Sequence, residues 1–495
     1  MKKIFNQNQS PKIKRTPFDL SHERKLSMGM GTLTPVLVQE VVPGDTFNIN
    51  TQSMIRFSPL VAPTMHRINS YIHYFYVPNR IIWKGWEDFI TGTTLSSIPT
   101  TRIQEVQVGS LADHLGVPTG DFTTGFGMVQ NLPFRAYFKI WNDYYRDENL
   151  EAAIDIEDQT VNDNYVITDM KRRSWEKDYF TSALPWAQKG NPVTMDTQIN
   201  YKNAFVNDGT ITPLTPGGAL EVGAHAYDEN NFIIQHGNTD PLYLENIQSI
   251  TLAVEELRRA TRLQRWMERN ARAGSRYVEH LLAHWGVKSS DSRLQRPEYI
   301  GGGKAPCVIS EVLNTTGTPT APQGEMAGHG ISVGQSNQAN KYCEEHGYII
   351  GIMSVMPEPT YQQGLPRHLS RLTPTDFYFP EFAQLGEQEV LNQEIYFQGT
   401  DHGLVQDIGT FGYQSRYAEY KYNQSTVHGL FKTDFDFWHM GRKFANLPTL
   451  NHAFINCQPT KRIFAVTDQE EELYVQLYHQ ITAIRPMPYF NDPKL

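Results

Sequence analysis

Short alternating segments of apolar and polar residues dominate the stretch from Thr34 to Arg80. Val36–Val42 is rich in β-branched residues, and the Pro-Gly-Asp sequence at 43–45 has the composition of a tight turn. The same alternation predicts three further strands, at Thr46–Asn50, Met54–Phe57 and Arg67–Val77. Strands this short, separated by frequent turns, are typical of a β-sandwich or barrel rather than of alternating strands and helices.

Helical periodicity is confined to the middle of the chain. Apolar residues recur every three or four positions in Ile81–Thr91, Leu132–Leu150 and Thr251–Gly286. From Val308 onward strand patterns return, at Tyr348–Met356, Thr410–Tyr422, Thr426–Trp438, Lys461–Val466 and Leu473–Ile484. Because strands lie at both ends, the pattern favours one mainly β domain with insertions. The roughly three domains suggested by length alone have no linkers to separate them.

The N-terminal residues 1–30 are predicted to be a basic arm. Within residues 1–25, seven lysines and arginines face only two acidic residues. The candidates for contact with DNA in this arm are Lys2, Lys3, Lys12, Lys14 and Arg15. The alternative interpretations are a contact with a neighbouring subunit and a solvated terminus with no partner.

Two insertions interrupt the predicted domain of residues 31–495. Residues 194–248 are rich in Asn, Thr, Gly and Asp, which predicts a variable surface insertion. Residues 251–286 form the helical insertion, whose polar face carries arginines. We expect four of them either to face the genome or to lie in a subunit interface, unless the face is merely solvated: Arg258, Arg262, Arg265 and Arg269.

A third basic segment, Lys171–Arg172–Arg173, precedes several aromatic residues. Cations interleaved with aromatic rings suit single-stranded nucleic acid, so these three residues are also candidates for facing DNA. The alternative is a buried connection between strands or subunits.

Overall charge and cysteine content reduce the number of functions that the chain could have. The net charge is −9, so the chain as a whole does not attract nucleic acid. Three widely spaced cysteines predict no disulfide framework and no zinc site. We expect no signal peptide, because the N-terminal residues 1–15 lack an apolar stretch. We expect no membrane insertion, because no apolar run approaches the roughly 18 residues that a spanning helix needs.

No arrangement of residues predicts catalysis, a metal site or a cofactor. Gly330–Gly334 matches G-x-S-x-G around Ser332, but neither a buried strand nor a helix is evident beside it. Gly301–Lys304 lacks the Ser or Thr and the spaced glycine of a phosphate-binding loop. His73 is expected to be a partly buried residue with its hydrogen bonds satisfied. The chain is therefore predicted not to be an enzyme.

Several longer phrases resemble the major capsid protein of the microviruses, most closely the gokushovirus branch of these single-stranded DNA bacteriophages. They include VQEVVPGDTF, SALPWAQKG and RLQRPEYIGG, followed by EHGYIIGIMSV, TYQQGLPR, FYFPEFAQLGEQEV and RPMPYF. Together they span nearly the whole chain in the order expected for that family. Residues 194–248 contain no such phrase, as expected for the family's variable insertion.

The resemblance implies an eight-stranded antiparallel jelly-roll that carries long helical and loop insertions. It implies a coat protein whose sixty copies form a T=1 icosahedral shell around circular single-stranded DNA. Further expected partners are a small basic DNA-binding virion protein, a minor pilot-type virion protein and a host-surface receptor. The expected location is the virion, assembled in the bacterial host cytoplasm.

An alternative from another functional class stays open at this point. Aromatic-rich β architecture is also found in jelly-roll enzymes and lectins that act on sugars. That alternative predicts saturable glycan binding by the isolated chain.

Overall fold

A computed structural model describes fourteen stretches of the chain. They are residues 14–91, 97–102, 105–122, 128–156, 170–187, 227–228, 231–232, 254–273, 279, 282–283, 294–313, 326–399, 404–467 and 471–490. The chain divides into two compact units, residues 1–187 with 273–495, and residues 188–272. The second unit contains helix α4 (Val254–Ala273) except for its last residue. It also contains the short strand pair β10 (Tyr227–Asp228) and β11 (Asn231–Phe232). In the described part, no helix is long and apolar enough to cross a membrane.

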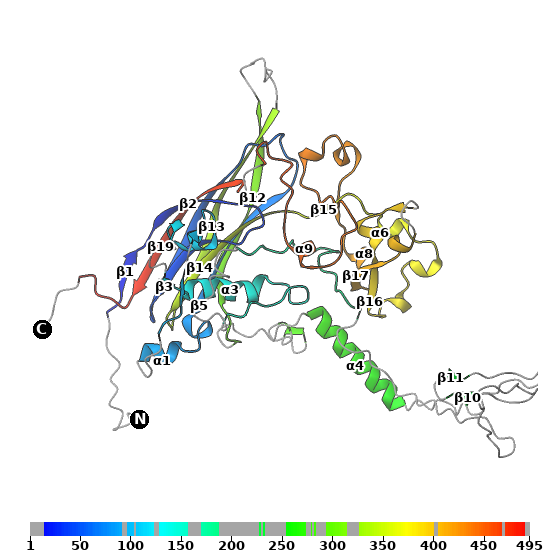
Figure 1. The fold of residues 1–495 in the computed structure, drawn as a ribbon, viewed down its shortest axis with the longest axis horizontal. Coiled ribbons are helices and arrows are strands. Elements are labelled where there is room, and N and C mark those ends of the chain that lie inside the picture. Colours follow the sequence, from blue (N-terminus) through cyan, green and yellow to red (C-terminus); the bar gives the residue numbers. More distant parts are fainter. Residues whose placement is uncertain are drawn as a thin grey trace, which may run out of the picture. The chain divides into compact units, whose positions relative to one another are not determined.

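The first unit is built on an antiparallel sheet of nine strands in its described residues (Figure 1). The order is β1-β19-β4-β13-β12-β5-β14-β3, and β2 also pairs with β19. The bounds are β1 Thr16–Asp19, β2 His22–Met28, β3 Thr34–Val41, β4 Thr46–Phe57, β5 Ile68–Pro78, β12 Glu298–Leu313, β13 Met326–Tyr342, β14 Gly347–Pro357 and β19 Leu473–Arg485. The first and last strands of the chain thus lie side by side, blue and red in Figure 1.

The sheet folds over so that its two ends face each other across one core. His479 of β19 hydrogen-bonds through Nε2 to the carbonyl oxygen of Val36 at 3.0 Å, although β19 and β3 lie near opposite ends of the strand order. Because that carbonyl can only accept, Nε2 donates and Nδ1 accepts from the Thr51 hydroxyl at 2.8 Å. The Tyr74 hydroxyl in turn donates to Thr51 at 2.5 Å. These buried polar groups join the two layers through a continuous chain of hydrogen bonds.

Alternation along the strands produces the core between the layers. Every second residue of β4 is buried, and β19 follows the same alternation for most of its length. The enclosed cluster includes Phe47, Ile49, Tyr74, Met353 and Leu477. Strand β14 is buried on both faces, because its other side packs against helices.

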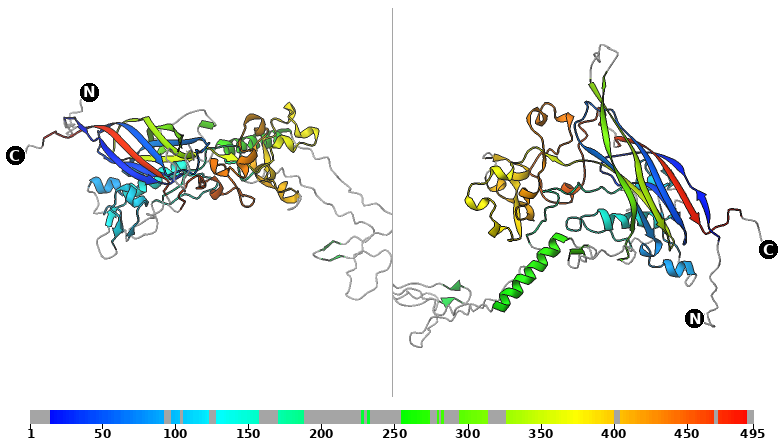
Figure 2. Two further views of the ribbon diagram at one scale, coloured as in Figure 1. Left: turned by 90° about the horizontal axis from the view of Figure 1, so that it is seen from above. Right: turned by 180° about the vertical axis from the view of Figure 1, so that it is seen from behind.

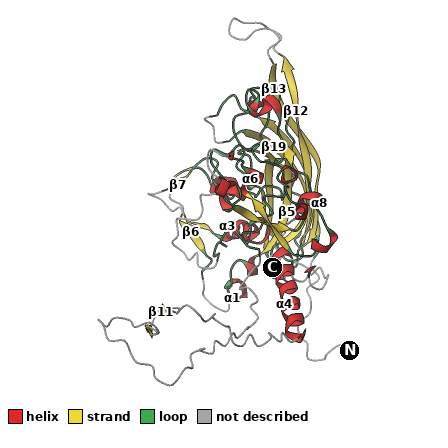
Figure 3. Ribbon diagram, turned by 90° about the vertical axis from the view of Figure 1, so that its right-hand side faces the viewer, coloured by secondary structure: helices red, strands yellow, loops and turns green. Residues whose placement is uncertain are grey.

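Helices cover the outer face of β5 and β14 (Figure 2). They are α1 (Trp86–Thr91), α2 (Leu111–Leu115) and α3 (Leu132–Ile140), and a π-helical turn at Trp141–Tyr145 continues α3. Two short strand pairs lie in the same region: β6 (Thr100–Arg102) with β9 (Met128–Gln130), and β7 (Glu105–Val106) with β8 (Gly120–Asp121). Figure 3 shows the strands of the sheet grouped together, with α1 and α3 beside them.

Residues 358–399 and 404–456 form a lobe with its own small core. Its elements are β15 (Thr360–Tyr361), β16 (Glu387–Leu391), α6 (Asn392–Ile395), α7 (Leu404–Asp407), β17 (Thr410–Ser415), α8 (Ala418–Lys421), β18 (Ser425–Thr426) and α9 (His452–Ile455). The core gathers Phe180 from the preceding connection with Tyr361, Val390, Phe411 and Phe454. The lobe is mostly loops and single turns of helix, yet it is anchored by buried aromatic rings.

The structure confirms a mainly β protein and corrects several predicted elements. The predicted strands Thr46–Asn50 and Met54–Phe57 are one strand, β4. Thr426–Trp438 is not the predicted strand. It contains only Thr426, the second residue of β18, and two turns of 3-10 helix. Arg462 donates to the carbonyl oxygens of Asp436 at 2.7 Å and Gly441 at 2.8 Å, so its side chain bonds the backbone there in place of a neighbouring strand.

One other predicted strand, Thr410–Tyr422, was partly right, and the predicted strand Lys461–Val466 was wrong. Thr410–Tyr422 is a strand only to Ser415, after which Tyr417 adopts a φ of 61° and a helical turn follows. Lys461–Val466 makes an isolated bridge between Leu60 and Phe464. The eight-strand count and the jelly-roll connectivity stay predictions.

Candidate functional site

Ser332, the serine of the G-x-S-x-G match, lies inside a strand and is not a nucleophile elbow. It belongs to β13, is 2% exposed, and its hydroxyl donates to the carbonyl oxygen of Pro306 at 2.9 Å. A nucleophile elbow needs an exposed serine on a strained strand-to-helix turn. Ser332 is therefore a structural residue of the sheet, and its hydroxyl group is occupied by the hydrogen bond to Pro306.

The other side chains that could take part in catalysis or in binding a ligand also have partners within the structure. Lys304 of the GGGK sequence lies 3.3 Å from a Glu176 carboxylate oxygen and over the Tyr71 ring. His73 bonds the Tyr145 hydroxyl at 2.8 Å, as expected of a satisfied residue, and burial lowers its pKa to about 4. Cys307, Cys343 and Cys457 are free and buried. In the described residues no group of three His, Cys, Asp or Glu side chains could hold a metal ion.

The basic segment 171–173 connects the sheet to the lobe. Arg172 donates to the carbonyl oxygens of Met30 at 3.2 Å and Cys457 at 3.3 Å. Arg173 donates to the Ser354 hydroxyl at 3.0 Å, and its guanidinium lies 4.1 Å from the centre of the Tyr71 ring. Lys171 lies over the Trp141 ring. These three cations therefore have partners within the chain.

Few of the N-terminal candidates lie in the described part of the chain. Lys2, Lys3 and Lys12 lie outside the described residues. Lys14 is exposed just before β1, and Arg15 donates to the Tyr342 hydroxyl at 3.3 Å. Residues 16–28 of the predicted arm form β1 and β2 and pair with β19, so this part is a sheet edge.

Helix α4 carries the other four basic candidates. Arg258, Arg262, Arg265 and Arg269 are all exposed. Their spacing of four, three and four residues places them on one face of a helix with 3.6 residues per turn. The helix therefore presents a continuous basic stripe about 16 Å long, at roughly 1.5 Å per residue.

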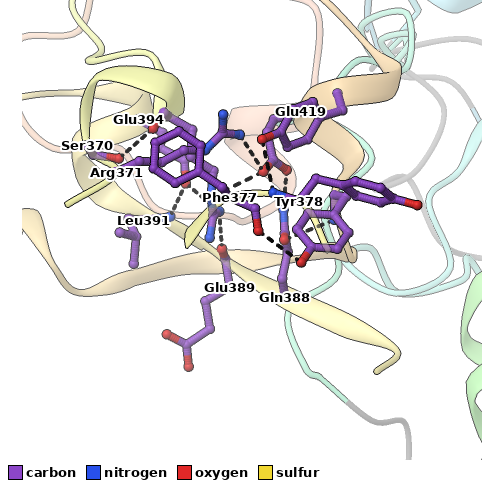
Figure 4. A network of polar contacts seen from close by, with 12 residues as sticks. Ser370, Arg371, Phe377, Tyr378, Gln388, Glu389, Leu391, Glu394 and Glu419 are labelled. Carbon is purple, nitrogen blue, oxygen red and sulfur yellow. Dashed lines mark hydrogen bonds and ion pairs between the residues drawn. The ribbon is translucent and has the colours of Figure 1, made fainter. Parts of the chain in front are cut away.

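A network of ion pairs lies in the lobe, where no sequence pattern indicated one (Figure 4). Arg367 pairs with Glu394 at 3.0 Å, and Arg371 pairs with Glu419 at 3.1 Å. Glu419 also accepts from the Gln388 amide at 2.6 Å, and Glu394 accepts from the Tyr179 hydroxyl at 3.0 Å. The Glu394 side chain is only 3% exposed, and burial raises the pKa of its carboxyl group.

Large apolar side chains stay exposed beside this network. The segment of residues 367–386 contains six of them: Leu369, Leu372, Phe377, Tyr378, Phe379 and Leu385. Sequence reasoning noted the aromatic phrase FYFPEF only as a family resemblance. Its lack of either helical or strand periodicity was the available signal that these rings do not all point into a core.

Comparisons with known proteins find matches along almost the whole chain. The family model described as capsid protein (F protein) matches residues 6–495. Capsid protein VP1 of Chlamydia phage 1 is 34% identical, with 100% of this chain and 98% of that protein covered. Capsid protein VP1 of Bdellovibrio phage phiMH2K is 35% identical over 99% of this chain and 97% of that protein. Capsid protein VP1 of Spiroplasma virus 4 is 29% identical over 99% and 97%.

Proposed function

The chain belongs to the capsid protein (F protein) family and is a phage capsid protein, and from that premise we propose that it assembles into a T=1 icosahedral shell of sixty copies around a circular single-stranded DNA genome. The observation that carries the proposal is the family match along almost the entire length. The two-layered antiparallel sheet supports the further proposal that the strands are connected as a jelly-roll.

The exposed apolar side chains also favour a subunit that is completed by neighbours. Closed shells repeat the same heterologous contacts around rotation axes, and interfaces of this kind are rich in aromatic residues and arginine. A structural capsid family is not an enzyme class. The remaining partners that we propose are a small basic DNA-binding virion protein, a minor pilot-type virion protein and a host-surface receptor. Assembly is proposed to take place in the bacterial host cytoplasm, and the product is the virion.

The proposed function is tested by imaging particles formed by the full chain together with the other proteins of its phage. We expect uniform T=1 shells that contain circular single-stranded DNA. We propose that residues 194–248, the variable surface insertion, are used in host attachment. A chain that lacks these residues is expected to form the same shells, which no longer adsorb to host cells. Unassembled chains under all conditions would contradict the shell, and unchanged adsorption would contradict the attachment role.

The basic candidates lead to a prediction about the packaged genome. We propose that the α4 stripe contacts DNA phosphates; the N-terminal residues Lys2, Lys3, Lys12, Lys14 and Arg15 and the segment 171–173 stay predictions. Changing all four arginines of the stripe to glutamine should make the DNA affinity less sensitive to salt. In a plot of log affinity against log salt concentration, the downward slope should become less steep. For single-stranded DNA the expected decrease is about 0.7 for each phosphate that the variant no longer neutralises. The measurement is a salt titration of circular single-stranded DNA binding by the full chain.

A matched variant distinguishes the loss of the α4 stripe from a general decrease in the positive charge of the chain. It replaces four exposed lysines elsewhere with glutamine: Lys25, Lys84, Lys421 and Lys432. This variant has the same net charge as the arginine variant, and we expect it to keep the wild-type slope. Equal slopes for the two variants would refute the assignment of DNA contact to α4.

A further inference from the structure

The apolar segment, residues 367–386, exposes an unusually large apolar area for a surface loop. Its six large apolar residues are between 42% and 89% exposed, with Leu372 the most exposed. At about 200 Å² for each fully exposed side chain, they present on the order of 700 Å². The largest apolar patch of an ordinary monomer is about 300–600 Å². One partner in a standard protein interface buries about 800 Å², so the exposed side chains of this segment, added together, amount to a large part of one side of such a contact.

Charged groups hold the apolar segment in place through ion pairs and hydrogen bonds, part of which Figure 4 shows. Arg371 pairs with Glu419, and its guanidinium lies 4.3 Å from the centre of the Tyr420 ring and 5.7 Å from that of Phe377. The Asp376 carboxylate accepts from the backbone nitrogen atoms of Leu372 at 2.9 Å and Thr373 at 2.8 Å. The loop is therefore ordered before any partner arrives, which lowers the entropy cost of association.

A second set of contacts fixes the aromatic part of the segment. The Tyr417 hydroxyl accepts from the backbone nitrogen of Phe379 and donates to the carbonyl oxygen of Phe377, both at 3.3 Å. The Tyr378 ring packs edge-on against Tyr417, with 4.9 Å between ring centres. The rings of Phe377, Tyr378 and Phe379 still remain 42–50% exposed, so this scaffold presents them to the surface.

The charge of the apolar segment argues against the genome as its partner. Its only lysine or arginine residues are Arg367 and Arg371, and both are already paired with glutamates. The remaining charged side chains, Asp376 and Glu381, are acidic and exposed, and they would repel phosphates. An apolar, aromatic surface with a rim of weak charge is typical of a contact between proteins.

Since the chain is a capsid protein, we propose that the apolar segment docks on a second copy of the same chain and is an intersubunit contact of the shell. This inference rests on the proposed function and adds the surface through which copies meet. Leu372 lies at its most exposed point and is the residue whose contact with the neighbour matters most.

The test replaces Leu372 with aspartate in the full chain. A buried, unpaired carboxylate in every repeated contact should lower the yield of shells by at least about ten-fold. The soluble subunit should unfold at the wild-type urea concentration, because Leu372 contributes little to its core. The control is Ile90→Asp in α1, an exposed apolar position outside the segment, which should assemble as wild type.

A second measurement does not depend on whether the Leu372→Asp variant folds, because it is made on assembled shells. A benzophenone amino acid at position 372 is expected to cross-link to another copy of this chain when assembled shells are irradiated. Cross-links to DNA or to another virion protein would overturn the proposal, as would wild-type shell yield from Leu372→Asp or an equal decrease with Ile90→Asp. If the wild-type chain forms no shells, the proposed function itself fails; if only the Leu372 results fail, the shell stands without this contact.

Discussion

Replacing Arg367 with methionine is expected to lower the free energy of unfolding of the unassembled subunit by about 3–5 kcal/mol at pH 7. The methionine keeps much of the apolar stem but leaves the Glu394 carboxylate without its cation. That carboxylate is almost fully buried, and removing one member of a buried ion pair leaves a charge that water cannot reach. Urea denaturation followed by circular dichroism measures the change.

The loss of stability should depend on pH in a definite direction. Burial already raises the folded-state pKa of Glu394 above its ordinary value of 4.5, and Arg367 opposes that rise. In the variant the folded pKa rises further, so between 4.5 and this pKa the folded state binds more protons than the unfolded state. Stability of the variant therefore increases as pH falls through that window, and the deficit relative to wild type shrinks.

Two further variants make the Arg367 result specific. Adding Glu394→Gln to Arg367→Met removes the unpaired charge and should recover much of the stability. Arg67→Met breaks an exposed pair with Glu358 at 3.5 Å and should change stability by no more than about 1 kcal/mol. A decrease of similar size in the Arg67 and Arg367 variants, or one independent of pH, would contradict the role assigned to the buried pair.

Changing Gly31 to alanine is expected to destabilise the subunit by about 2–5 kcal/mol, combining a left-handed backbone with a steric clash. Gly31 has a φ of 78°, and a Cβ there would lie 2.2 Å from the carbonyl oxygen of Cys457. The backbone nitrogen of Gly31 donates to Val355, and its carbonyl accepts from Arg173. Three chain segments meet at this residue, so none of them can move away without breaking other hydrogen bonds.

Gly429→Ala separates the two contributions. Gly429 has a similar φ of 66°, but nothing lies within 4 Å of the position of its Cβ. Gly429→Ala should therefore lower the free energy of unfolding by about 1–2 kcal/mol, which is the cost of the left-handed backbone alone. Equal urea midpoints for the two alanine variants would show that the contact with Cys457 contributes nothing.

Two strands of the sheet were predictable almost to their ends, because β-branched and other apolar residues dominate their buried positions. Strands β14 and β19 lie within one residue of their predicted bounds. Strand β4 was predicted as two pieces because Thr51 and Ser53 are polar yet buried. Thr51 tolerates burial through its bonds to Tyr74 and His479, which are distant in sequence. A local pattern cannot contain that information.

The candidate surfaces were predictable to different degrees. Helical spacing alone placed the four arginines of α4 on one face, and the structure shows all four exposed. Arg172 and Arg173 looked like a basic patch, but their partners lie more than a hundred residues away in sequence. The apolar segment had no periodic signal, because its order comes from ion pairs and hydrogen bonds with β16, α6 and α8.

Strand β19, near the C-terminus, has a consequence for biosynthesis. It pairs with β4 on one side and with β1 and β2 on the other, so it occupies the interior of the sheet and not its rim. During translation β4 therefore has an open edge until residues 473–485 leave the ribosome, and pairing between segments so distant in sequence is slow. The nascent polypeptide exposes an unpaired strand throughout that interval, and molecular chaperones are the natural means of shielding it.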